Sequence, residues 1–204
     1  MKLEDFKISP QWDTPEGRHA CNSFYKEIWQ DNEYNRFGVG VQPNDIVVDC
    51  GANIGIFSQY AVHNGADKVY AFECGDEEFK YLKINTENTN KIITTKGYIS
   101  DLDIDGNYNL EKIFKTYNLN HIDFIKVDIE GYEYAFILNS NDEYFNKVNK
   151  WAIELHIFGM FQNSPEYFAK VFSIIEKFSL NGFKISMEHI HKNTNLFMLY
   201  ASKL

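Results

Sequence analysis

The chain has 204 residues, a formal net charge of −9 and a sequence pI near 5.1, so a basic face for nucleic acid is not expected. Its 44% hydrophobic content excludes a disordered chain, and its length fits one domain with a sizeable core. The sequence has no apolar run of roughly 18 residues and no apolar leader, which predicts a cytoplasmic protein without a membrane span. Three cysteines without zinc-ligand spacing also favour a reducing compartment.

Residues 1–44 precede the first predicted strand and contain one helical pattern. Phe24, Tyr25, Ile28 and Trp29 recur at helical spacing. Two interpretations stay open for this extension. It is either a helix packed over an edge of the sheet or a lid over the cofactor or the substrate.

A glycine turn follows the first predicted strand, at 45–49. A helix-like segment starts near Ile54, between Gly51 and the residues after Gly55, and a second apolar run, 68–73, ends on Glu73. A strand, a glycine turn, a helix and a second strand ending in an acid are typical of nucleoside-binding α/β sheets, in which the acid accepts bonds from ribose hydroxyls. The predicted cofactor-binding residues here are Asp49, Gly51, Ala52, Asn53, Gly55 and Glu73.

The glycine spacing argues against a dinucleotide. Asn53 and Ile56 stand where a G-x-G-x-x-G fingerprint counted from Gly51 needs glycine. Asp49 would repel a diphosphate but suits an ammonium or sulfonium group. S-adenosylmethionine is therefore favoured over NAD, with an NAD-dependent oxidoreductase as the alternative function. A strand-to-helix turn without a ligand is the plainer interpretation of the same residues.

The rest of the chain alternates helices and strands. The predicted strands lie at 92–99, 124–129, 151–156, 183–190 and 195–201. The predicted helices lie at 79–85, 110–117 and from 134, and another begins at Ser164-Pro165 and ends at Asn181-Gly182, while 101–109 is predicted as a loop. The last two strands are too close in sequence for a crossover, so they must form a hairpin. We therefore expect a doubly wound α/β sheet, mostly parallel, with one antiparallel strand and helices on both faces.

Four segments resemble, in order, the motifs of FkbM-type methyltransferases, a class I S-adenosylmethionine-dependent family. They are residues 45–55, 69–73, 122–133 and 151–156. One departure is Cys74, where the family is expected to have proline after the ribose-binding acid. The resemblance implies a seven-stranded Rossmann-like sheet, S-adenosylmethionine as cofactor, and a saccharide or other small-molecule hydroxyl as methyl acceptor. It also implies that Ser100 and Asp101, after the third strand, contact the adenine.

The fourth and fifth predicted strands end in polar residues that share faces. Lys126, Asp128 and Glu130 alternate along one strand, and Glu154 and His156 along its neighbour. An unperturbed imidazole titrates near pH 6.5, roughly, so His156 is the predicted general base, with Asp128, Glu154 and Lys126 beside it.

Other interpretations of these polar residues stay open. A divalent metal held by Asp128, Glu130, Glu154 and His156 is the alternative to a histidine base. His156 could also be a strand-end histidine bonded to the backbone, and Lys126 an ion-pair partner rather than a catalyst.

The whole chain, 1–204, is predicted to be one methyltransferase domain, with an extension at 1–44 and a Rossmann-like core at 45–204. A non-catalytic S-adenosylmethionine-binding protein is the third function considered. The acceptor, the choice between oxygen and nitrogen methylation, and the oligomeric state, with a homodimer as one option, stay open.

Overall fold

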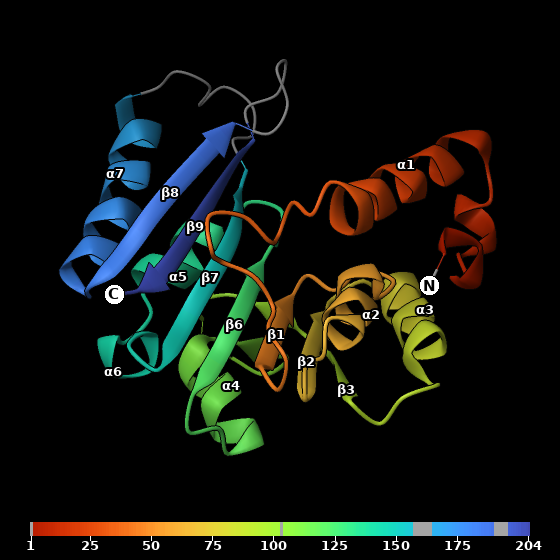
Figure 1. The fold of residues 1–204 in the computed structure, drawn as a ribbon, viewed down its shortest axis with the longest axis horizontal. Helices are drawn as coiled ribbons and strands as arrows, with labels where there is room; N and C mark the ends of the chain where they lie inside the picture. Colours follow the sequence, from red (N-terminus) through yellow and green to blue (C-terminus); the bar gives the residue numbers. More distant parts are fainter. Residues whose placement is uncertain (1, 103, 157–164, 190–195) are drawn as a thin grey trace.

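A seven-stranded sheet in the order β3-β2-β1-β6-β7-β9-β8 forms the centre of the computed structural model (Figure 1). The model describes residues 2–102, 104–156, 165–189 and 196–204. The strands are β1 (Ile46–Cys50), β2 (Lys68–Glu73), β3 (Ile92–Lys96), β6 (Ile122–Val127), β7 (Val148–Leu155), β8 (Phe183–His189) and β9 (Phe197–Lys203). β9 is antiparallel to both of its neighbours, and the other pairings are parallel, which confirms the predicted fold class.

Helices cover both faces of this sheet (Figure 1). The α-helices are α1 (Pro15–Tyr25), which belongs to the N-terminal extension and does not lie on the sheet, and α2 (Ile56–His63), α3 (Asp76–Thr86), α4 (Leu110–Tyr117), α5 (Glu133–Leu138), α6 (Asp142–Phe145) and α7 (Pro165–Leu180). Successive residues of β1 point to opposite faces, so Val47 packs in the core under α2 and α3, and Val48 in the core under α4, α5 and α7. Because the parallel strands are buried on both faces, they appear in the sequence as continuous runs of apolar residues.

Three predicted boundaries need correction. The strand predicted at 92–99 ends at Lys96, and β4 (Tyr98–Ile99) then pairs with β5 (Asn107–Tyr108) inside the stretch predicted as a loop. Gly97 lies between β3 and β4. A side chain does not fit there, because a Cβ would lie 2.6 Å from the Tyr108 ring. The strands predicted at 124–129 and 151–156 begin earlier, at Ile122 and Val148, because sheet pairing includes polar residues that an apolar run leaves out.

The N-terminal extension packs on α2, which corrects its placement over an edge of the sheet. α1 continues as a five-residue π-helical turn, η3 (Lys26–Gln30), after the short turns η1 (Leu3–Asp5) and η2 (Pro10–Trp12). The Trp29 indole donates a hydrogen bond to the Ile56 carbonyl and meets the Tyr60 ring edge-on. These contacts hold the extension against α2, on the side of the sheet where the first glycine turn lies.

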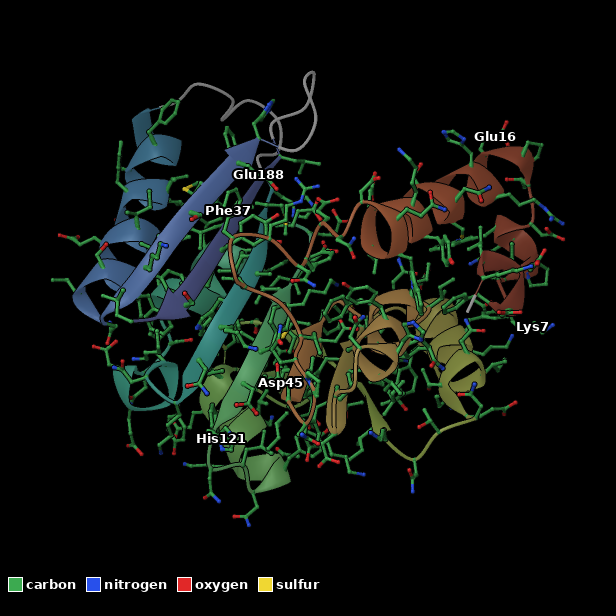
Figure 2. All side chains as sticks on the ribbon, in the orientation of Figure 1. Lys7, Glu16, Phe37, Asp45, His121 and Glu188 are labelled. Atoms are coloured by element: carbon green, nitrogen blue, oxygen red, sulfur yellow. The ribbon has the colours of Figure 1, made fainter. Side chains whose placement is uncertain are left out.

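Residues 31–41 then cross the face of β6, β7 and β9 (Figure 1). Arg36 forms an ion pair with Glu188 of β8 at 2.7 Å, and the Phe37 ring packs on Tyr200 of β9. Figure 2 shows Phe37 and Glu188 close together at this place. The extension is thereby tied to both halves of the sheet.

Parts of two predictions lie outside the described residues, namely the Ser164 helix cap and the turn around residues 192–194. Within the described residues, no helix is both long and apolar enough to cross a membrane.

Candidate functional site

A cavity of about 360 Å³ opens at the carboxyl ends of β1, β2, β6 and β7. Open parallel sheets place their ligands at this edge, and small-molecule sites span about 300–1,000 Å³. Nine of the predicted site residues line it: Gly51, Ala52, Asn53, Glu73, Lys126, Asp128, Glu130, Glu154 and His156. The structure therefore brings the two predicted halves of the site into one cavity.

The first glycine turn is shaped by a close contact between two loops. Gly51 has φ +80°, and a Cβ on it would lie 1.8 Å from the Asp128 carbonyl oxygen. Only glycine fits there, since both the backbone conformation and the space exclude a side chain. Gly55, with φ +92°, does not line the cavity; it lets α2 approach Leu82 and Thr86 of α3.

Glu73 is buried at the end of β2, and its carboxylate is held in place by the glycine turn. Oε2 accepts a 2.7 Å hydrogen bond from the Asn53 backbone N–H, and Oε1 accepts one of the same length from Gly75. Each carboxylate oxygen has a second lone pair for a ligand hydroxyl. The geometry suits a nucleoside ribose held by two hydrogen bonds.

Asp49 does not line the cavity, so the expectation that it faces the cofactor is corrected. Its side chain is fully buried, with Oδ2 accepting a hydrogen bond from Ser58 at 2.6 Å and Oδ1 lying 3.3 Å from Lys126 Nζ. Lys126 also donates to the Gly51 carbonyl and lies 3.4 Å from Asp128. Burial lowers the pKa of Lys126, but Asp49 and Asp128 outweigh it and raise the value, so the lysine stays charged.

Two carboxylates and a tyrosine meet at the opposite end of the cavity from Glu73. The Tyr34 hydroxyl lies 3.2 Å from Oε2 of Glu154 and 3.4 Å from Oδ2 of Asp128. Burial, and then the negative charge of Asp128, raises the pKa of Glu154 to about 8. Tyr34 comes from the N-terminal extension, so that segment forms part of the cavity wall, in keeping with the lid interpretation.

His156 lies buried beside this pair, and both ring nitrogens face carboxylates. Nδ1 is 3.0 Å from Oε1 of Glu133, and Nε2 is 3.6 Å from Glu130 and 3.9 Å from Asp128. Burial opposes protonation, but the bond to Glu133 and the nearby carboxylates prevail and raise the pKa of His156 to about 9. The ring is therefore protonated at neutral pH, which weighs against its predicted role as general base.

Ser100 and Asp101 lie outside the cavity wall. Asp101 accepts a hydrogen bond from the Asn139 side chain at 2.8 Å, and Ser100 is buried against Asn107. The wall next to Glu73 is instead formed by Gly97, Tyr98 and Ile99. The predicted adenine contact of Asp101 thus has no support from its position, because the third strand ends earlier than expected.

Sequence reasoning missed three site residues: Glu33, Tyr34 and Glu133. Glu33 is buried in the cavity wall, and burial, followed by the charge of Glu27, raises its pKa to about 7. Tyr34 lies 94 residues from Asp128 and 120 from Glu154 in the sequence, so no local pattern pointed to it. Glu133 belongs to a recognised motif, but only the fold shows that its carboxylate holds His156.

Comparisons with known proteins agree with this fold. Residues 104–185 match the family model "Methyltransferase FkbM domain". A 63-residue segment is 44% identical to the 31-O-demethyl-FK506 methyltransferase of Streptomyces tacrolimicus, covering 30% of this chain and 24% of that protein. The chain thus spans about a quarter of that relative's length.

Two solved structures share the fold. Fibrillarin from Aeropyrum pernix, with natively bound S-adenosyl-L-methionine, superposes with a TM-score of 0.61 at 12% identity, covering 87% of this chain and 75% of that one. A putative S-adenosylmethionine-dependent methyltransferase from Listeria monocytogenes gives 0.59 at 13% identity, covering 89% and 99%. At such identities the likeness shows the fold alone. The family match over residues 104–185, the partial match to the Streptomyces protein and the sheet order thus support a class I methyltransferase fold with an FkbM-type segment in this chain.

Proposed function

We propose that this protein binds S-adenosylmethionine and transfers its methyl group to a hydroxyl of a saccharide or another small molecule. The observation that carries the proposal is the Glu73 carboxylate, fixed by two backbone N–H groups at the end of β2 and open to the cavity. The family match supports the methyl-transfer chemistry. A relative named for an O-methylation supports a hydroxyl acceptor.

The cofactor would lie with its ribose on Glu73 and its adenine near Tyr98 and Ile99, which line the adjoining wall. The methionine part would then extend along Gly51 toward Asp128. Carboxylates dominate this part of the wall, which suits a sulfonium and an ammonium group. The turn again argues against the diphosphate of NAD, because Asn53 stands where a pyrophosphate-binding turn that starts at Gly51 needs glycine.

The transfer itself is an in-line displacement at the end of the cavity near Tyr34. The acceptor oxygen would attack the methyl carbon, the carbon–sulfur bond would break, and its electron pair would stay on sulfur. The hydroxyl proton must leave as well. Glu154, in its carboxylate form, is the group that would accept that proton, since it lines the cavity and shares a hydrogen bond with Tyr34. A divalent cation, predicted from the sequence, is part of the same proposal and would assist the loss of the proton.

Two other functions have less support. An NAD-dependent oxidoreductase has less support because the glycine turn lacks the glycines that a pyrophosphate needs. A non-catalytic cofactor-binding protein has less support because it would not need Glu154 and His156, which line the far end of the cavity. Two proteins of the same fold are named putative RNA or rRNA methylases, but their identity to this chain is 20% and 12%. The net charge of −9 does not favour an RNA acceptor.

Calorimetry with S-adenosylhomocysteine tests the cofactor part directly. We expect binding by the wild type, weakening by about 1.5–3 kcal/mol in Glu73→Ala, and no heat with NAD. Glu16→Ala is the matched control, because Glu16 is exposed at the far end of α1 (Figure 2). Tight NAD binding without binding of the homocysteine product would overturn the proposal.

A further inference from the structure

The carboxylates and the imidazole at the Tyr34 end of the cavity have the spacing of metal ligands. One ligand atom each from Asp128, Glu130 and His156 lies within 4.8 Å of the others. First-row metals bind such atoms at about 2.0–2.2 Å, so two ligands on one ion are separated by about 3–4.2 Å, depending on the angle. The distances from His156 Nε2 to Glu130, 3.6 Å, and to Asp128, 3.9 Å, fall in this range.

A buried carboxylate behind the histidine fixes the direction of its ring. Glu133 is fully buried and accepts hydrogen bonds from the backbone N–H groups of Ile129 and Gly131 as well as facing Nδ1 of His156. Nε2 is thereby aimed at Asp128 and Glu130. Histidines that bind metals are held in this way, with the distal nitrogen on a carboxylate. A histidine with a purely structural role would need only the hydrogen bond at Nδ1, whereas here Nε2 also faces two carboxylates.

The backbone brings the third ligand to the same place. Glu130 has φ +53°, a left-handed conformation that is costly for a residue with a side chain. Its side chain is 77% exposed, so burial does not account for this conformation. The turn nevertheless directs the carboxylate toward His156.

Three carboxylates, those of Asp128, Glu130 and Glu154, lie within 4 Å of His156. Lys126 already pairs with buried Asp49. A bound metal would replace the proton on Nε2 of His156. Protein-bound cations that combine carboxylate oxygens with one imidazole are hard or borderline divalent metals. An ammonium group would suit the carboxylates but not the imidazole.

We infer that Asp128, Glu130 and His156 form a binding site for a divalent metal of the Mn²⁺ class, with Glu133 as the orienting group. Among the described residues, Glu154 is not one of these three ligands, so its carboxylate form would be left to accept a proton. The inference rests on the proposed function for its role: a metal-bound hydroxyl loses its proton more easily, so the acceptor oxygen would bind the metal beside the sulfonium.

Titration with Mn²⁺ alone, followed by the electron paramagnetic resonance signal of the free ion, tests the site without a turnover assay. We expect one bound ion per chain in the wild type. Glu130→Gln should weaken binding at least about tenfold and Glu133→Gln about 10–100-fold, whereas Glu154→Gln should weaken it less than Glu130→Gln does. Glu16→Gln is the control for loss of one exposed carboxylate and should bind as the wild type does.

Circular dichroism and thermal unfolding show whether each variant is folded, and Glu130→Gln keeps the test decisive because its side chain is exposed. Absence of Mn²⁺ binding at millimolar concentrations, or equal binding by the wild type and Glu130→Gln, would overturn the inference. The cofactor titration is made without metal. If S-adenosylhomocysteine binds but Mn²⁺ does not, only the metal site is refuted. If Mn²⁺ binds but S-adenosylhomocysteine does not, the proposed function is refuted.

Discussion

Lys126 Nζ, in the cavity wall, lies 3.3 Å from Oδ1 of Asp49 behind that wall, and both side chains are almost completely buried. In the described part of the chain, Oδ1 of Asp49 has no other polar partner. The lysine therefore supplies the opposite charge at Oδ1, while Ser58 donates a hydrogen bond to Oδ2. Burial of one member of such a pair without the other costs much more than the pair itself contributes.

Lys126→Met should destabilise the fold by about 3–5 kcal/mol, because it leaves Asp49 as an uncompensated buried charge. Adding Asp49→Asn should recover part of the loss. Urea unfolding of the two single variants and the double variant measures this coupling. Lys170→Met, at an exposed position on α7, is the control and should leave the stability nearly unchanged. Additive effects at positions 49 and 126 would contradict the pairing.

Gly51→Ala should destabilise the protein more than Gly106→Ala does. Both glycines have φ near +80°, but an added Cβ meets the Asp128 carbonyl only at Gly51 and nothing within 4 Å at Gly106. The backbone strain of about 1–2 kcal/mol is common to both variants, and the clash adds about 1–3 kcal/mol at Gly51 alone. Urea unfolding of both variants gives the difference. Equal losses would show that the two loops do not need their close approach.

Glu33 should make the stability of the protein depend on pH. Its pKa is raised to about 7 in the fold, from an ordinary value of 4.5, by burial and by Glu27. The folded state therefore binds the proton more tightly, and its stability decreases as the pH rises from about 4.5 to 7.

Glu33→Gln removes this dependence, since glutamine resembles the protonated acid. The variant should be more stable than the wild type by about 2–3 kcal/mol at pH 8 and equal to it near pH 4. Thermal unfolding across the pH range measures the difference, with Glu16→Gln as control. A constant difference at all pH values would rule out titration of Glu33 as the cause.

Tyr98→Ala should weaken binding of S-adenosylhomocysteine, and Asp101→Ala should not. Tyr98 lines the cavity next to Glu73, where an aromatic ring can stack on a base, which contributes about 1–3 kcal/mol. Asp101 is bonded to Asn139 outside the wall. Calorimetry on both variants compares them. Loss of affinity in Asp101→Ala with none in Tyr98→Ala would restore the adenine contact predicted from the family resemblance.

The sequence by itself determined the fold class, because the apolar runs, the glycine turn at 51–55 and the short link between the last two strands have local causes. Side-chain alternation predicted that Asp128 and Glu130 share a face, and that Glu154 and His156 do. Asp128, Glu130 and His156 instead lie beyond the ends of β6 and β7, although all four side chains line the same cavity. Strand boundaries were less accurate where, as at Asp123 and Lys150, sheet pairing extends through polar residues.

Only the tertiary structure decided which of these side chains face the cavity. Asp49 and Lys126 share the chemistry of site residues, yet the carboxylate is buried below the wall and the amine lies in it. Tyr34 and Glu133 reach Glu154 and His156 across long sequence separations, which no period of 2 or 3.6 residues encodes. The pKa values near 8 and 9 at Glu154 and His156 have the same origin, because burial and neighbouring charges exist only once distant segments have packed together.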